Sequence, residues 1–144
     1  MFFALLPFII FCFLLLAAVR PLAIFLEGIM KDTTPQAVLA CHELLRWLIP
    51  HLDKFPRVRR FTLGERLEST LLEVLEATVE SAYTRNKQPS LQRANLRLEV
   101  ARHLWRLSHE FQAIPTRSYE HGARLMDDLG RQLGGWLRSL PGGA

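Results

Sequence analysis

Four stretches of the chain carry apolar residues at intervals of three and four positions, the spacing that places side chains on one face of an α-helix. They cover residues 38–52, 63–82, 91–108 and 119–140. The last stretch has the most regular heptad spacing. No segment of useful length alternates between apolar and polar residues with a period of two. The pattern therefore predicts an all-α protein.

Proline and small polar residues separate these stretches and predict where the helices begin and end. Thr34 before Pro35 is typical of an N-cap followed by proline at the first helical position. Pro50 is expected to kink or end the first helix, because proline has no backbone N–H donor. Ser90 is the expected cap of the third helix, and a turn at residues 114–116 precedes the fourth.

The start of the second helix is predicted from a capping box. Thr62 and Glu65 stand three positions apart, so that each side chain can bond to the other residue's backbone N–H. Residues 55–60 before them are predicted to form the connection after the first helix. Connections this short place neighbouring helices antiparallel, and each helix has one apolar face to bury. The predicted fold class is an all-α, up-down-up-down four-helix bundle over residues 30–144.

An apolar N-terminal segment, residues 1–29, precedes this bundle domain. Its first 19 residues carry no charged side chain, and as a helix they would span about 28 Å, close to the thickness of a bilayer core. Three interpretations stay open: a stretch upstream of a true start at Met30, an inner-membrane anchor through residues 1–26, and a cleaved signal peptide. The first predicts a cytoplasmic protein, and the second predicts a membrane-tethered one.

No motif for catalysis or metal binding occurs in the sequence. The five histidines form no i,i+4 pair and no HExxH motif. The two cysteines, Cys12 and Cys41, indicate neither a disulfide framework nor a zinc site. Phosphate-binding loops and nucleophile elbows do not occur either. The sequence therefore predicts a protein without catalytic residues, metal or cofactor.

Positive charge is concentrated in two parts of the chain. The formal net charge is +4, and 15 of the 18 basic residues are arginine, whose planar guanidinium group binds phosphate oxygens in bidentate fashion. Lys54, Arg57, Arg59 and Arg60 crowd one connection, and residues 85–138 hold ten basic against five acidic groups. Concentrated basic groups favour a polyanionic partner such as nucleic acid.

The third helix places two arginines, Arg93 and Arg97, within its apolar arc instead of on its polar side. A guanidinium group in such a position needs a partner. One interpretation is a salt bridge to glutamates of the second helix. The other is an inter-subunit surface or a channel lined with guanidinium groups for an anionic polymer. The sequence leaves both open.

A second apolar flank also runs along the third helix, beyond the stripe that its bundle neighbours need. Apolar surface on two flanks of one helix is typical of burial between subunits. We therefore expect a homo-oligomer. The flank consists of Leu96, Val100, Leu104, Leu107 and Phe111.

Several motifs resemble those of the bacterial accessory variability determinant (Avd) and its four-helix-bundle relatives. The most specific is the string GRQLGGWL at residues 130–137, and Tyr119-Glu120-His121 stands before it. FPR at residues 55–57 and RFTLG at residues 60–64 match moderately well. The resemblance covers residues 35–140, so the apolar N-terminal segment is not part of it.

The resemblance implies a small basic bundle that assembles as a homopentamer and does no chemistry itself. Such a protein binds a reverse transcriptase and supports template-RNA-dependent complementary DNA synthesis in a diversity-generating retroelement. The basic residues that match the family, together with two from the charge pattern, are then candidate contacts to RNA, DNA or the polymerase. Those that match are Arg57, Arg60, Arg93, Arg106 and Arg131, and those from the charge pattern are Arg59 and Arg97.

The glycines and the tryptophan of the same string are interpreted as packing residues. No strand precedes them, so a phosphate-binding loop is not predicted, and close approach of helices is the expected role. They are Gly130, Gly134, Gly135 and Trp136. Related bundles encoded within ribosomal RNA intervening sequences share the architecture without an assigned activity. The alternative function is therefore a membrane-tethered or structural helical interaction protein with no role in reverse transcription.

Overall fold

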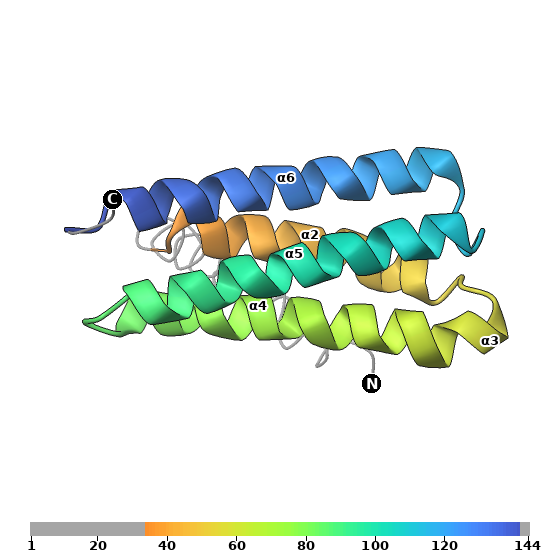
Figure 1. Cartoon of the computed structure of the whole chain (residues 1–144), viewed down its shortest axis with the longest axis horizontal. Coiled ribbons are helices and arrows are strands. Elements are labelled where there is room, and N and C mark those ends of the chain that lie inside the picture. The colour runs from red at the N-terminus through yellow and green to blue at the C-terminus, as the bar shows by residue number, and fades with distance from the viewer. Residues whose placement is uncertain (1–33, 142–144) are drawn as a thin grey trace, which may run out of the picture. The chain divides into compact units, whose positions relative to one another are not determined.

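The computed structural model describes residues 34–141, and Figure 1 shows their four long helices packed side by side. Consecutive helices run antiparallel, and each contacts two neighbours: α2 and α5 each lie between α4 and α6. The predicted all-α four-helix bundle is confirmed for these residues. The helices are α2 (Gln36–Leu52), α4 (Glu65–Tyr83), α5 (Gln88–Glu110) and α6 (Thr116–Arg138).

The core is built from the apolar stripes that the sequence predicts. The apolar stripes of α2 and α5 are buried at every position that the spacing predicts: Val38, Cys41, Leu45, Leu48 and Leu52 in α2, and Leu91, Ala94, Leu98, Ala101, Trp105 and Ser108 in α5. Predicted positions at the helix ends, such as Leu63, Ala82 and Leu140, are only partly buried. Each fully buried leucine contributes about 1.5–3 kcal/mol relative to an exposed one. Packing of the four stripes therefore holds the helices together.

Trp105 lies in the middle of this core and fixes the distance between α5 and α6. Its side chain is 1% exposed, and its Nε1–H donates a hydrogen bond of 3.0 Å to the Tyr119 carbonyl. A Cβ atom at Gly122 would stand 2.7 Å from the indole ring. The absence of a side chain at Gly122 therefore allows the ring to lie against the α6 backbone.

Helix α2 begins one residue later than predicted and is not ended by its proline. Pro35, not Thr34, occupies the N-cap position, and its carbonyl accepts hydrogen bonds from the Val38 and Leu39 amides. Pro50 lies inside the helix, which continues to Leu52. Because Pro50 is in the last turn, its missing N–H removes only one bond at an end that frays in most helices.

The second helix begins well before the predicted position. Residues 57–83 are helical without interruption, as α3 (Arg57–Arg59), η1 (Arg60–Gly64) and α4 in turn. Pro56 is the N-cap residue, and its carbonyl accepts bonds from the Arg59 and Arg60 amides. The predicted connection over residues 55–60 is therefore wrong in its second half. The arginines of that segment lie on a helix and not in a loop.

The predicted capping box at Thr62 is wrong for the same reason. The Thr62 hydroxyl lies 3.4 Å from both the Val58 and the Arg59 carbonyls, and it donates backward into the preceding turn. Backward bonding of this kind is common for threonine inside a helix. Residues 60–64 form a π-helical turn, and Glu65 starts regular α-helix only after it.

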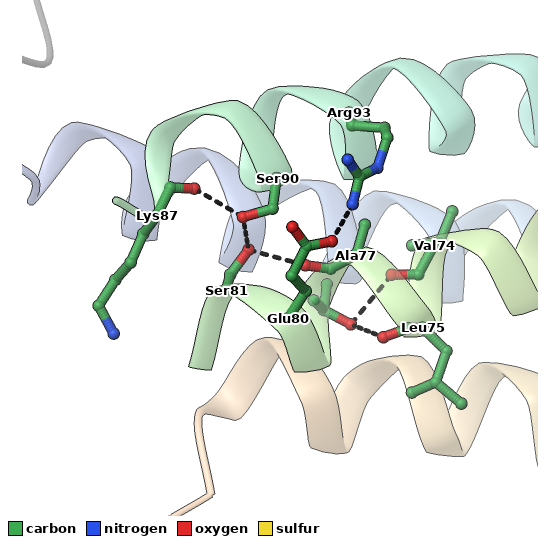
Figure 2. A network of polar contacts seen from close by, with 9 residues as sticks. Val74, Leu75, Ala77, Glu80, Ser81, Lys87, Ser90 and Arg93 are labelled. Carbon is green, nitrogen blue, oxygen red and sulfur yellow. Dashed lines mark hydrogen bonds and ion pairs between the residues drawn. The ribbon is translucent and has the colours of Figure 1, made fainter. Parts of the chain in front are cut away.

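Ser90 does not cap α5, although the sequence predicts that it does. Lys87 is the N-cap residue, and Ser90 lies in the first turn. Its hydroxyl donates to the Lys87 carbonyl at 3.1 Å and bonds to the Ser81 hydroxyl at 2.8 Å (Figure 2). Both serines are buried. Buried hydroxyl groups are normally hydrogen-bonded. This bond meets that need and links α4 to α5.

Cys41 is buried in α2, and burial raises the pKa of its thiol from 9.0 to about 12. The thiolate is the form that reacts with alkylating agents, so very little reactive species is present at pH 8. We expect iodoacetamide to modify Cys41 only as fast as the protein unfolds, and rapidly in denaturant. Peptide mass mapping separates Cys41 from Cys12. Modification of Cys41 in the folded protein within minutes would contradict this expectation.

A membrane-crossing helix is not found in the part of the chain that the structure describes, where no helix is both long and apolar enough. The interpretations of residues 1–29 as an upstream stretch, an anchor or a signal peptide concern residues outside the described part. They stay predictions.

Candidate nucleic-acid interface

Three of the candidate arginines lie together at the end of the bundle where α5 ends and the second helix begins (Figure 1). Arg57 is exposed in the first turn. The Arg59 guanidinium group lies over the Phe111 ring, 4.5 Å from its centroid. Arg60 Nη2 forms an ion pair of 2.7 Å with Asp53. We call the surface formed by Lys54, these three arginines and the exposed side chains of Val58, Phe61 and Phe111 the basic end.

Arg93 and Arg97 form salt bridges between α5 and α4. Arg93 pairs with Glu80 (Figure 2), and Arg97 Nε lies 2.7 Å from Glu73 Oε2. Of the two interpretations that the sequence leaves open, the structure therefore contains the salt bridge to glutamates. Both pairs keep more than a third of each side chain exposed. Such pairs typically contribute less than about 1 kcal/mol, so these arginines are still accessible to a partner.

Arg106 and Arg131 are not part of the basic end. Arg106 is exposed on α5 and lines a shallow pocket of about 230 Å³ with Trp105 and Tyr119. Arg131 is exposed, lines a pocket with Pro35 and Lys87, and pairs with Asp128 on its own helix. The structure thus brings together only part of the predicted set.

Arg102 joins α5 to α6, a role that the sequence did not indicate. Its Nη2 donates to the Met126 carbonyl at 3.0 Å and lies 3.1 Å from Asp127 Oδ1. Its Nη1 pairs with Glu99, and its buried Nε has no hydrogen-bond partner. A Cβ atom at Gly130 would collide with the Arg102 guanidinium group. The neighbour of Gly130 is therefore a side chain of α5, and the close approach of helices predicted for this glycine stays a prediction.

Within the described chain Gly134 and Gly135 have no close helix neighbour, and their predicted packing role stays a prediction. A Cβ atom at Gly134 would meet only Arg138, at 3.6 Å, and one at Gly135 would meet nothing within 4 Å. These glycines lie beside the buried stripe of α6 and not in it. Trp136 is partly buried against the core, and the Lys87 ammonium group lies 5.7 Å from its ring centroid. These contacts lie at the edge of the core, and the packing role predicted for Trp136 stays a prediction.

The histidines and carboxylates of residues 34–141 include no group of three or more that could hold a metal ion. Two of the histidines stack on aromatic rings instead. His51 stacks on Trp47 at a centroid distance of 4.0 Å, and His109 stacks on Tyr119 at 4.7 Å. The arrangement is that of a packed bundle with charged side chains on its outside.

The described residues form a strand-free four-helix bundle, the architecture of a small all-α protein. A family model described as bAvd-like matches residues 36–140, which include all four long helices. The chain belongs to the bAvd-like family, and the resemblance found in the sequence is confirmed. No curated protein and no solved structure matches the chain.

Proposed function

We propose that this chain is a non-catalytic accessory subunit of a diversity-generating retroelement. In this proposal it binds the reverse transcriptase and the template RNA in the cytoplasm and supports mutagenic complementary DNA synthesis. The observation that carries the proposal is membership of the bAvd-like family over the whole four-helix bundle. The polymerase supplies the chemistry, so this chain needs no catalytic residue or cofactor.

The basic end supports an RNA-binding role on physical grounds. Four basic side chains lie within residues 53–61, and Asp53 is the only carboxylate in that segment. Arg60 already pairs with it. Arg57 and Lys54 are exposed, so a phosphate group can approach them without displacing a carboxylate. A cluster of this kind attracts polyanions even though the net charge of the chain is only +4.

Homo-oligomerisation, as a pentamer by resemblance, is part of the same proposal. The flank of α5 supports it, because Leu96 is 65% exposed and Leu107 is also exposed. Burying these side chains between subunits would remove apolar surface from water. An oligomer would also repeat the basic end around the assembly, and repeated weak sites bind one polymer with higher avidity.

Salt dependence of RNA binding tests the proposal. Each phosphate that is neutralised adds about 0.7 to the slope of log affinity against log salt for a single strand. We expect the affinity to fall steeply as salt rises, and the slope to fall by about 0.7 to 2, for one to three lost phosphate contacts, when three arginines of the basic end are replaced by alanine. Fluorescence anisotropy at a series of salt concentrations measures the affinity and therefore the slope. The variant is Arg57→Ala, Arg59→Ala and Arg60→Ala together.

A matched triple variant removes the same charge elsewhere and serves as the control. Exposed arginines contribute little to stability, so both variants are expected to melt close to the wild-type temperature. If the control lowers the slope equally, RNA does not bind preferentially at the basic end. If the purified protein binds neither RNA nor a reverse transcriptase encoded beside its own gene at low salt, the proposal fails and a structural role replaces it. The control is Arg85→Ala, Arg124→Ala and Arg138→Ala.

A further inference from the structure

Exposed apolar side chains lie among the arginines of the basic end. Phe61 is 65% exposed, Phe111 is 52% exposed and Val58 is 76% exposed. The bundle core itself contains an aromatic side chain, Trp105. The two phenyl rings lie outside this core, where a ligand can reach them.

Phe61 lies in the π-helical turn of the second helix. In a regular α-helix a residue three positions before Gly64 shares its face, and Gly64 is buried against Phe55. Residues 60–64 form a wider π turn instead, and Phe61 is largely exposed. Turns of this kind are rare and are frequent at functional sites.

Phe111 is already in contact with a planar cation. The Arg59 guanidinium group lies over its ring, which brings the start of the second helix against the end of α5. Nucleobases stack both on aromatic rings and on arginine guanidinium planes. Arg59 and Phe111 together therefore form a flat surface of the kind on which a base stacks.

Apolar side chains stand among cations along this segment, in the order Arg57, Val58, Arg59, Arg60, Phe61. A single-stranded nucleic acid alternates planar bases with charged phosphates, and proteins bind it with aromatic platforms inside a basic surface. We propose that the basic end binds unpaired nucleotides, with bases stacked on Phe61 and on the Arg59–Phe111 pair and with phosphates on Arg57 and Lys54. This inference rests on the proposed function and specifies its ligand.

A duplex and a lipid surface fit the same features less well. The bases of a duplex are already stacked on one another, so their faces cannot reach an exposed ring. A helix that lies in a membrane surface needs a continuous apolar face opposite its charged one. In α3 and η1 the exposed large apolar residues are Val58 and Phe61, which are too few for such a face.

Ring removal in the full-length protein tests the inference. A labelled oligoadenosine RNA strand and an RNA duplex of equal length are titrated by fluorescence anisotropy. We expect Phe61→Ala and Phe111→Ala each to weaken binding of the strand by about 5- to 100-fold. The salt slope should stay at the wild-type value, because no phosphate contact is lost. Phe61→Tyr keeps a ring and should bind as the wild type, whereas Phe61→Leu should not.

Several results would overturn the inference while leaving the proposed function intact. One is a wild-type affinity for the strand in both alanine variants, with a salt slope that still depends on the arginines. Another is equal affinity for the strand and the duplex.

A change in native mass for Phe111→Ala, without a change in RNA affinity, would place that ring in a subunit contact. If the alanine variants sediment less than the wild type with phosphatidylserine vesicles and bind RNA equally well, the rings contact a membrane. Failure of the wild type to bind either RNA would instead remove the RNA-binding part of the proposed function.

Discussion

Replacing Trp105 by alanine should lower the free energy of unfolding by about 3–5 kcal/mol, the usual cost of removing a large aromatic side chain from a core. The indole is almost completely buried between α5 and α6. Its removal leaves a cavity, and it also leaves the Tyr119 carbonyl without the Nε1–H donor at 3.0 Å. The edge contact with the Trp47 ring is lost as well. Urea denaturation followed by far-ultraviolet circular dichroism measures the change.

Trp136→Ala is the matched control for this experiment. Trp136 is also a tryptophan in a helix, but it only packs against the edge of the core and is partly exposed. Less apolar surface returns to water when its ring is removed, so the loss of stability should be clearly smaller. Equal losses for the two variants would show that burial in the core does not decide the cost at Trp105.

The helices could be predicted because burial follows a local rule. Residues three or four positions apart share a helix face, so a stripe such as Leu91, Ala94, Leu98 identifies the buried side without knowledge of its neighbours. All three are buried. Antiparallel order then follows from the short connections. The fold is therefore contained in patterns that extend over a few turns.

The helix starts could not be predicted as well, because several residues compete for each cap. Thr62 and Ser90 both carry hydroxyl groups that suit an N-cap, yet both lie inside helices. Pro56 begins the second helix six residues before Thr62. The Ser90 hydroxyl bonds to Ser81 on α4 instead of capping α5. Which of these two bonds forms depends on how α4 and α5 pack, and local sequence does not show that.

The candidate site was predictable in composition but not in geometry. The sequence places Arg57, Arg59 and Arg60 close together, and the structure keeps them so on one helix. The sequence could not indicate that Arg59 contacts Phe111, which is distant along the chain. It also could not indicate that Arg102 extends past Gly130 to α6. Contacts between helices depend on their rotation and height relative to each other, which apolar spacing constrains only loosely.

Gly122→Leu and Gly135→Leu should change stability in opposite directions, although both replace a glycine inside α6. A Cβ atom at Gly122 would stand 2.7 Å from the Trp105 ring, and a buried ring cannot move aside cheaply. Overpacking of this kind typically costs about 1–3 kcal/mol, and we expect the upper end of that range. At Gly135 the space is open, so leucine should stabilise the helix by up to about 0.8 kcal/mol through its higher helix propensity.

Thermal melting and native mass should be measured together for the two variants, because they separate packing within a chain from packing between chains. Helix propensity acts inside one subunit, so a stabilised Gly135→Leu variant with an unchanged assembly would fit the open surface seen at that position. A smaller native mass would mean that another subunit lies against Gly135. The glycine would then be a packing residue after all, because the close approach that it permits would be to a second copy of the chain and not to its own helices.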